Sequence, residues 1–392
     1  MVNFNYRVGP YGFLSSNEIA QNSTLSLNNG LKDQRQLLKW VNQHIDKVSH
    51  HYRIHRQFLI LIHVQFGGNP GHVTMGGASA GAGSVLLQLT AYGGRNDSLF
   101  HAAAAESPAM PPLRTPGESQ WQYVALLKLA GCKDLECLRT MDAVTFQNAV
   151  RAMKMPYPGG SRPPIFPWNP TLDQDFIKDY TYNEFQNNNF VKVPTIFGDA
   201  THEGLGFTSK AVNSVQKAYA FIQDQFPGMT PDDEKRIQAV WKGPPDAQRD
   251  PLWRNVAADI YGHIRYQCPC LNVSAAYADN GTAPTWEYRW NLGEALHVAE
   301  LGPIWNNGST AAAAFIHAYW ASFIRSYDPN KYPAEYHING VETRSPEWKI
   351  FGDANGERLL FNDDDIVKME EVKDEEWNQC NVITDIRLQN KQ

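Results

Sequence analysis

Residues 66–92 read FGGNPGHVTMGGASAGAGSVLLQLTAY, and they carry the strongest local structural signals of the chain. Its first glycines and proline predict a turn, and the β-forming valine and threonine that follow lie in a short strand expected over residues 72–76. Helical spacing of apolar residues begins at Ala80. A strand, a sharp glycine-rich bend and a helix within about 20 residues make up half of an α/β unit. The stretch therefore predicts an α/β fold with a tight bend at residues 77–81.

The alternation of strands and helices continues along the chain. Further strands are expected at residues 100–106, 191–197 and 285–290, and a helix at residues 311–325. Residues 208–280 have helical spacing. Because strands separated by helices form a mostly parallel sheet covered on both faces, we expect one α/β domain over residues 1–392 with a helical excursion at residues 208–280.

Composition and charge exclude several classes of protein. The chain has 392 residues, of which 42% are hydrophobic, so it is neither disordered nor a small disulfide-stapled module. Lys and Arg total 35 against 41 Asp and Glu, a net charge of −6 that lacks the basic surface of a nucleic-acid binder. The longest apolar run, Phe58 to Phe66, is about half of what a membrane span needs. We expect a small-molecule substrate, no nucleic acid and no integral membrane segment.

The bend at residues 77–81 carries a candidate nucleophile. Gly77-Ala78-Ser79-Ala80-Gly81 matches G-x-S-x-G between an expected strand and an expected helix, which is the setting of a nucleophilic serine. Small residues at the two glycine positions would permit a strained turn at Ser79, and the backbone N–H of Ala80 is the expected first donor to an oxyanion. The alternative is a small-residue turn that only packs the helix against the strand.

A nucleophilic serine needs a base and a carboxylate that orients the base. In α/β-hydrolases these residues follow in the order Ser, Asp or Glu, and His. The segment VPTIFGDATHEG offers Asp199 at the end of an expected strand and Glu203 just before Gly204, which would let the backbone bend there. Spacing alone leaves both carboxylates open.

Four later histidines could act as the base. His317 lies on an apolar helix face, as a packed core histidine would, and His263 lies in a helix-like stretch. His337 is in a polar loop near the C-terminus. His297 follows the strand TWEYRW in a loop, which is where a mobile imidazole at a sheet edge is expected. The sequence therefore favours His297.

Several motifs together resemble one family. NYRVGPYGFL (residues 5–14), FGGNPGHVTMGGASAG (66–81), GDATHEG (198–204) and YWASFIRSYDPN (319–330) are similar to segments of the type-B carboxylesterase/lipase family, especially its secreted fungal members. The resemblance implies an α/β-hydrolase fold and hydrolysis of carboxylic esters through an acyl-enzyme. It also implies a triad of Ser79, Glu203 and His297, which favours Glu203 over Asp199. No cofactor is implied, and the net charge favours an uncharged ester.

The resemblance also bears on cysteines and secretion. Cys132 and Cys137 have the spacing of a local disulfide and match a disulfide loop of the family. Cys380 resembles the family cysteine that bridges to the helical region, so its partner is expected to be Cys268 or Cys270. We expect a secreted glycoprotein, although the amino terminus has no signal peptide, with N-x-[ST] acceptor sites at Asn22, Asn96, Asn272, Asn280 and Asn307.

Three departures from the family pattern stand out. Ala78 precedes the nucleophile where the family often has an acidic residue, so no cholinesterase-like specificity is implied. The family has further N-terminal strands and a glycine-rich HGGG-type loop with oxyanion donors ahead of residue 5, so we expect a domain incomplete at its N-terminus with little activity. Residues 48–65, VSHHYRIHRQFLILIHVQ, resemble no family element, and we interpret this anomalous insert as a retained in-frame intron. Its histidines lack a scaffold for a metal, and no metal site is expected.

The same motifs are also compatible with two other functions. The chain could be a catalytically impaired, truncated esterase homologue, or a non-enzymatic binding module related to cholinesterases. Residues 155–168 and 301–307 are candidate walls of the substrate pocket. The acidic stretches at residues 363–365 and 370–376 are expected to form a solvated face.

Overall fold

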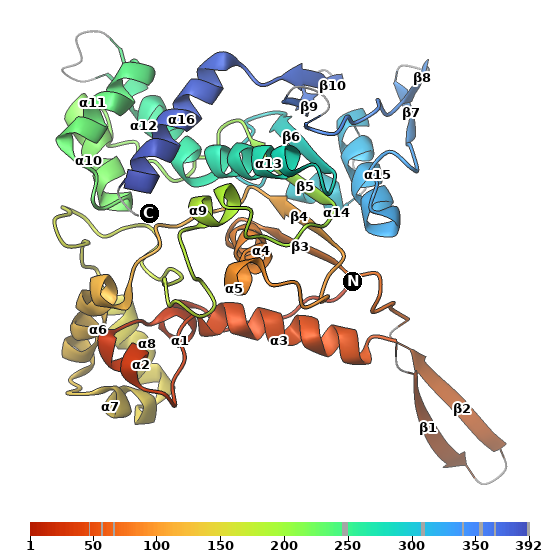
Figure 1. Cartoon of the computed structure of the whole chain (residues 1–392), viewed down its shortest axis with the longest axis horizontal. Helices are drawn as coiled ribbons and strands as arrows, with labels where there is room; N and C mark the ends of the chain where they lie inside the picture. Colours follow the sequence, from red (N-terminus) through yellow and green to blue (C-terminus); the bar gives the residue numbers. More distant parts are fainter. Residues whose placement is uncertain are drawn as a thin grey trace.

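A six-stranded sheet lies at the centre of the computed structural model (Figure 1). The strand order is β10-β9-β6-β5-β4-β3, all neighbours are parallel except β10 against β9, and β3 forms one edge. The strands are β3 (Thr74–Ala78), β4 (Ala102–Glu106), β5 (Thr195–Ala200), β6 (Thr285–Asn291), β9 (Glu357–Asn362) and β10 (Ile366–Glu371). The mostly parallel sheet expected from the sequence is confirmed.

The structure describes all residues except 47, 56–57, 66, 245–249, 307–309, 339–340, 353–355, 364–365 and 390–392, and only the backbone within 48–55, 58–65, 338 and 341. The helices before β5 are α1 (Gly9–Phe13), α2 (Asn17–Gln21), α3 (Asn29–His44), α4 (Ala80–Leu89), α5 (Ala91–Gly94), α6 (Pro116–Ala130), α7 (Leu135–Thr140), α8 (Ala143–Ala152) and α9 (Thr181–Gln186). Those after it are α10 (Val215–Gln225), α11 (Pro231–Val240), α12 (Leu252–Gly262), the π-helix η1 (His263–Gln267), α13 (Cys268–Asn280), α14 (Leu301–Trp305), α15 (Ala311–Ser326) and α16 (Asp374–Gln389).

Helices cover both faces of the sheet. Ala103 and Ala105 of β4 pack in one apolar cluster with α4 and α13, whereas Ala102 and Ala104 pack in another with α14 and α15. This alternation follows from the pleat, which turns successive side chains to opposite faces. An all-apolar strand such as β4 therefore lies between two layers of helices, as parallel strands usually do.

Two strands lie a few residues later than expected. The strand expected at 191–197 is β5, which begins at Thr195, because Pro194 has no N–H to donate to a ladder. The N–H of Val191 instead donates to the carbonyl of Leu89 at the end of α4. The strand expected at 72–76 is β3, which begins at Thr74 and runs directly into the bend.

The insert at residues 48–65 forms an antiparallel pair of strands, β1 (Val48–His55) and β2 (Phe58–Gln65). The two strands pair with each other in a sheet of their own. Figure 1 shows this hairpin projecting from the body of the molecule at the end of α3. A second small sheet consists of β7 (Glu335–Ile338) and β8 (Val341–Arg344). Among the described helices, none has the length and apolar character of a membrane span.

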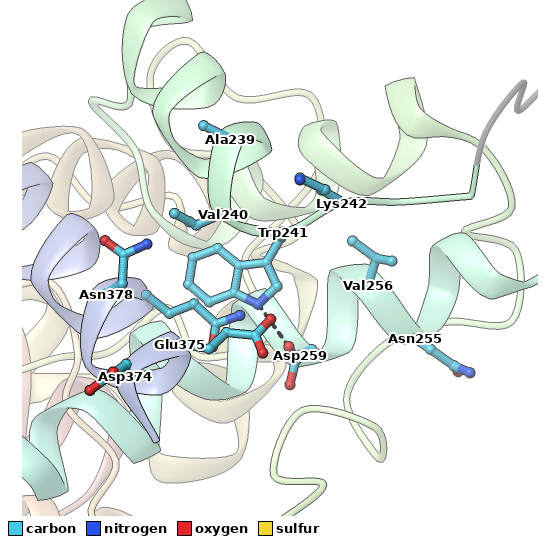
Figure 2. Close-up of a pocket in the computed structure, with 11 residues that line it drawn as sticks. Ala239, Val240, Trp241, Lys242, Asn255, Val256, Asp259, Asp374, Glu375 and Asn378 are labelled. Atoms are coloured by element: carbon cyan, nitrogen blue, oxygen red, sulfur yellow. Dashed lines mark hydrogen bonds between the residues drawn. The ribbon is translucent and has the colours of Figure 1, made fainter. Parts of the chain in front are cut away.

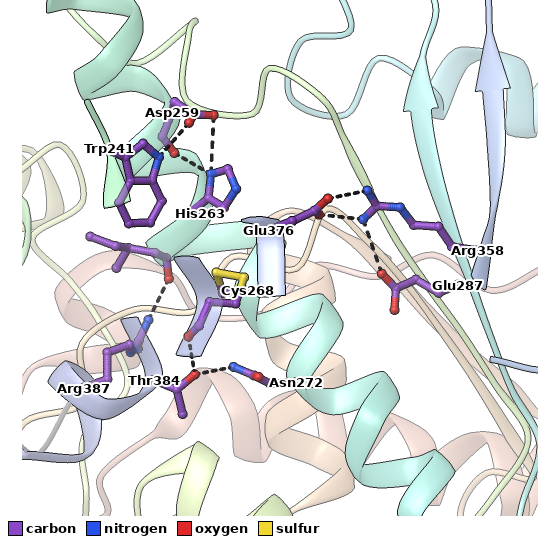
Figure 3. Close-up of a disulfide and its surroundings, with 12 residues drawn as sticks. Trp241, Asp259, His263, Cys268, Asn272, Glu287, Arg358, Glu376, Thr384 and Arg387 are labelled. Atoms are coloured by element: carbon purple, nitrogen blue, oxygen red, sulfur yellow. Dashed lines mark hydrogen bonds and ion pairs between the residues drawn. A yellow bond between two sulfur atoms is a disulfide. The ribbon is translucent and has the colours of Figure 1, made fainter. Parts of the chain in front are cut away.

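Two disulfides join helices. Cys132, just after α6, is bonded to Cys137 in α7. Cys268 at the start of α13 is bonded to Cys380 in α16, as Figure 3 shows, and Cys270 is a buried free thiol. The structure therefore selects Cys268 from the two partners that the sequence leaves open.

Candidate active site

Ser79 lies in the bend between β3 and α4 in a conformation that non-glycine residues rarely adopt. Its φ is 55° and its ψ is −119°. A Cβ on Gly77 would lie 2.6 Å from the carbonyl carbon of Gly81, so the bend requires glycine at position 77. At Gly81 a Cβ would meet no described atom within 4 Å, so a small side chain would also fit there. This strained backbone conformation places the Ser79 side chain at the start of α4.

Ser79, His297 and Glu203 form a chain of hydrogen bonds. His297 Nε2 is 2.7 Å from Ser79 Oγ, and His297 Nδ1 is hydrogen bonded to Glu203 Oε2. Glu203 Oε1 accepts the N–H of Ala200 at 2.8 Å, and the Glu203 side chain is fully buried. A buried carboxylate on Nδ1 holds the imidazole with its Nε2 toward the serine. The structure thus brings together three of the side chains singled out from the sequence.

The loops that carry Glu203 and His297 are bound to each other. The N–H of His202 donates to the carbonyl of Ala295 at 2.9 Å, and the ring Nδ1 of His202 is 2.9 Å from the carbonyl oxygen of Glu294. Gly204 is needed for close packing: a Cβ there would lie 1.8 Å from the carbonyl oxygen of Ala258 in α12. Glycine is therefore needed at position 204 because α12 packs closely against it, whereas the sequence alone had led us to expect a bend of the backbone there.

Aromatic rings surround His297 on the side of the helical excursion. The ring centroid of Tyr266, in η1, is 4.3 Å from that of His297, and Phe207 is 5.2 Å away. Phe166 packs edge-on against Phe207 at 5.8 Å and is 41% exposed. The segment 155–168, expected as a pocket wall, therefore reaches the candidate site through Phe166.

The family model described as "Carboxylesterase family" matches residues 1–49 and 61–380. The chain belongs to the carboxylesterase family. The match leaves out residues 50–60, which lie within the hairpin of β1 and β2.

Relatives and a solved structure support this carboxylesterase assignment. Secreted lipase 4 from Gibberella zeae is 26% identical over 381 residues, covering 90% of this chain and 63% of that protein. Lipase 2 from Geotrichum candidum is 28% identical over 423 residues, covering 99% of this chain and 68% of that protein. The crystal structure of Aspergillus niger EstA matches with a TM-score of 0.82 and 32% identity, covering 99% of this chain and 74% of that one. The chain thus spans about two thirds of the length of the two lipases. The match to the EstA structure confirms the α/β-hydrolase fold.

Two further buried glutamates, Glu106 and Glu300, lie close to each other, and Glu300 is near enough to Glu203 to be affected by its charge. Glu300 Oε1 accepts hydrogen bonds from Tyr288 Oη at 2.9 Å and Ser107 Oγ at 3.2 Å. Burial, followed by the charge of Glu203, raises the pKa of Glu300 to about 7. Burial and the charge of Glu300 raise the pKa of Glu106 to about 8. The pair therefore retains a proton at pH values where an ordinary glutamate is ionised. Sequence reasoning missed this feature because the residues lie nearly 200 positions apart.

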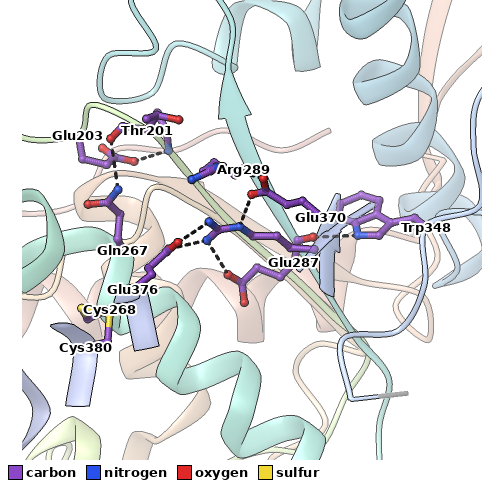
Figure 4. A network of polar contacts seen from close by, with 12 residues as sticks. Thr201, Glu203, Gln267, Cys268, Glu287, Arg289, Trp348, Glu370, Glu376 and Cys380 are labelled. Carbon is purple, nitrogen blue, oxygen red and sulfur yellow. Dashed lines mark hydrogen bonds and ion pairs between the residues drawn. A yellow bond between two sulfur atoms is a disulfide. The ribbon is translucent and has the colours of Figure 1, made fainter. Parts of the chain in front are cut away.

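Asp199, the other candidate carboxylate, lies near the charges of Arg358, Glu287 and Glu376, and Figure 4 labels the two glutamates. Its carboxylate is fully buried and has no hydrogen-bond partner among the described residues, and burial raises its pKa. Ligand atoms of Asp199, Cys270 and Glu287 lie within 4.8 Å of one another. Arg358 provides the positive charge beside them, since its guanidinium lies 3.8 Å from Glu287. Because this guanidinium would repel a metal cation, we interpret the buried carboxylates as partners of Arg358 rather than as metal ligands.

The same arginine corrects part of the expectation of a solvated acidic face. Arg358 is fully buried and binds Glu376 through two hydrogen bonds of 2.8 and 2.7 Å and Glu370 through one of 2.8 Å. Glu370 also binds Arg289 at 2.7 Å. Glu370 and Glu376 are therefore half-buried against guanidinium groups. The remaining described acidic residues of the two stretches are exposed, as expected: Asp363, Glu371, Asp374 and Glu375. Residues 364–365 lie outside the described residues.

The other histidines have structural partners. His263 Nδ1 contacts the Asp259 carbonyl at 2.9 Å, and His317 Nδ1 contacts the Ile304 carbonyl at 2.8 Å. His337 lies in β7.

A surface groove of about 780 Å³ lies between α11, α12 and α16, where Trp241 donates its indole N–H to Asp259 (Figure 2). Its lining contains none of the three triad residues.

The expected glycosylation sites differ in exposure. Asn22 and Asn96 are exposed. Asn272 is half-buried and its amide donates to Thr384 Oγ1 at 2.7 Å, and the amide of Asn280 donates to the carbonyl of Ala276. Because a glycan replaces an amide proton, Asn272 does not suit glycosylation in the folded chain. Asn307 lies outside the described residues.

Proposed function

We propose that this chain hydrolyses carboxylic esters through an acyl-enzyme formed on Ser79. The observation that carries the proposal is the continuous hydrogen-bonded chain from Ser79 Oγ through the His297 ring to buried Glu203. Membership of the carboxylesterase family supports the reaction class. Relatives named as secreted lipases and the two disulfides support secretion, with glycans at Asn22 and Asn96.

The first half of the reaction attaches the acyl group to the serine. His297 Nε2 takes the proton of Ser79 Oγ as the oxygen attacks the ester carbonyl carbon. Glu203 accepts the hydrogen bond of Nδ1–H and stabilises the imidazolium. Ala80 is the first residue of α4, so its N–H has no acceptor within the helix and can donate to the oxyanion.

The second half releases the acid. The tetrahedral intermediate collapses, His297 gives its proton to the departing alkoxide oxygen, and the alcohol leaves. Water then enters, His297 takes a proton from it, and the resulting hydroxide attacks the acyl carbonyl. The second tetrahedral intermediate collapses by breaking its bond to Ser79 Oγ, His297 returns the proton to that oxygen, and the carboxylic acid departs.

Trapping the acyl-enzyme tests the proposal even where turnover is slow. The full chain and a Ser79→Ala variant are incubated with a fluorophosphonate probe and with p-nitrophenyl butyrate. We expect one probe per chain on the peptide that contains Ser79, a butyryl mass increment on the same peptide and release of nitrophenolate, all absent in the variant. Unlabelled Ser79 in a folded chain would refute the proposal and favour a non-enzymatic binding module.

A further inference from the structure

Four arginines are buried among the described residues, and three of them have clear partners. Arg35 pairs with Asp97 at 2.6 Å, and Arg358 binds two glutamates. Arg387, labelled in Figure 3, donates to the carbonyls of Ile264 and Pro111. Within the described part of the chain, the side chain of the fourth, Arg265, makes no hydrogen bond and no ion pair.

Arg265 is buried in spite of this lack of partners. It is 6% exposed, and its Nε atom is buried without an acceptor. Its guanidinium carbon lies 5.2 Å from the ring centroid of Phe166, a weak interaction compared with a carboxylate. An arginine keeps its charge in proteins, and a buried charge without a partner destabilises the fold. The nearby charge of Arg387 increases this cost, because its effect on Arg265 is repulsive.

Arg265 also lies beside the catalytic residues. The N–H of Ala109 donates to the Ser79 carbonyl at 3.1 Å, and the next N–H, of Met110, donates to the Arg265 carbonyl at 2.9 Å. Tyr266, the residue after Arg265, packs against the His297 ring. The aromatic contacts from His297 through Phe207 to Phe166 end at the Arg265 guanidinium.

Arg265 lies in the middle of η1, a single turn of π-helix between α12 and α13. Such turns insert an extra residue into a helix and occur frequently at functional sites. The same turn carries Tyr266 against His297 and Gln267, whose amide donates to the carbonyl of Thr201 at 3.3 Å. The turn thus presents Arg265 from the same short segment that contacts both triad loops.

We propose that Arg265 is a specificity-determining residue that binds a carboxylate of the substrate, so that the ester cleaved at Ser79 also carries a free acid group. This inference rests on the proposed esterase function and names its substrate class. An unpaired guanidinium at Phe166, on a residue whose backbone contacts the segment beside Ser79, offers a planar pair of donors that matches a carboxylate. The substrate differs from the uncharged ester that the net charge favours, because recognition depends on the charges that line the site rather than on the total of −6.

Matched esters test this substrate class. Monomethyl glutarate carries the acid in its acyl part and is compared with methyl butyrate, while 4-acetoxybutyrate carries it in its alcohol part and is compared with butyl acetate. We expect the wild-type chain to favour the anionic ester in one of these pairs. In Arg265→Met the ratio of kcat/KM between the anionic and neutral ester of that pair should fall by about 10- to 100-fold, the usual range for a hydrogen bond to a charged group.

Two further variants separate binding from structure. Arg265→Lys retains the charge and should retain part of the preference. Arg35→Met removes a buried arginine that has an ion-pair partner, and it should leave the ratio unchanged while lowering Tm. Arg265→Met should not lower Tm, because it removes a buried charge without a partner. An unchanged ratio in both ester pairs, or a lower Tm in Arg265→Met without a change in ratio, would overturn the proposal.

Binding to Ser79→Ala keeps this inference separate from the proposed activity. Calorimetry with the anionic and neutral esters measures affinity without turnover, in Ser79→Ala and in Ser79→Ala combined with Arg265→Met. We expect tighter binding of the anionic ester only where Arg265 is present. Equal affinities in the two variants would contradict the inference even in an active esterase, whereas Arg265-dependent binding without hydrolysis by the wild type would contradict the proposed function alone.

Discussion

Replacing Glu106 by glutamine is expected to stabilise the folded chain at neutral pH. Glu106 ends β4, is 2% exposed, and one of its carboxylate oxygens has no hydrogen-bond partner among the described residues. Burial, with the charge of Glu300, raises its pKa from 4.5 to about 8. Below pH 4.5 the group is protonated in both the folded and the unfolded chain. As the pH rises toward 8, the unfolded chain releases the proton and the folded chain retains it, so stability is lost.

The magnitude follows from the width of this pH interval. Each pH unit between the two pKa values changes the free energy of unfolding by about 1.4 kcal/mol. From the ordinary pKa of 4.5 to pH 7 the loss reaches at most about 3 kcal/mol. Glutamine has nearly the same shape and no proton to release, so Glu106→Gln removes this loss. The stabilisation should therefore be largest at neutral pH and vanish near pH 4.5.

Urea unfolding followed by circular dichroism measures the effect. The wild type, Glu106→Gln and the exposed control Glu347→Gln are compared at pH 5 and pH 7.5. We expect the gain of Glu106→Gln to increase by about 2–3 kcal/mol between the two pH values and the control to show no such increase. A destabilised Glu106→Gln chain, or a gain that does not depend on pH, would show that Glu106 is ionised or needed as a carboxylate, and the reasoning would be refuted.

Three further predictions concern the triad, the second disulfide and the hairpin. Glu203→Gln should lower kcat for p-nitrophenyl butyrate by about 10²–10⁴-fold, whereas Asp199→Asn should change it only a few-fold; equal losses would contradict the assignment of Glu203. Cys380→Ser should lower the free energy of unfolding by about 2–4 kcal/mol and Cys270→Ala by about 1 kcal/mol or less, measured in urea without reductant. Deletion of residues 48–65 should shift Tm by less than about 2 °C in calorimetry, because among the described strands β1 and β2 pair only with each other, and a larger decrease would show that the hairpin supports the domain.

Local sequence patterns predicted the parts of the fold that depend on neighbouring residues. The strand, bend and helix around Ser79 follow from glycine spacing and apolar periodicity within about 20 positions. The alanine run of β4 likewise predicts a strand buried on both faces. Errors in strand ends arose where a single residue such as Pro194 prevented pairing, which a hydrophobic pattern does not detect.

Long-range contacts decided what the sequence left open. Asp199 and Glu203 lie four positions apart, so their spacing left both open and only the family resemblance favoured Glu203. In the structure the His297 ring is hydrogen bonded to Glu203. Cys268 and Cys270 lie two positions apart on one helix and so face in different directions, but which of them meets α16 depends on how α13 is rotated. The sequence did not single out Arg265, because only the packed structure shows that its buried side chain has no partner among the described residues.

The bridge between Cys268 and Cys380 has a consequence for a chain exposed to proteases. It closes a loop of sequence separation 112 that contains His297, while Ser79 and Glu203 lie before it. A single cut anywhere inside this loop leaves the two fragments covalently linked in an oxidising medium. The nicked molecule can therefore keep Ser79, Glu203 and His297 together, and it would come apart only after reduction.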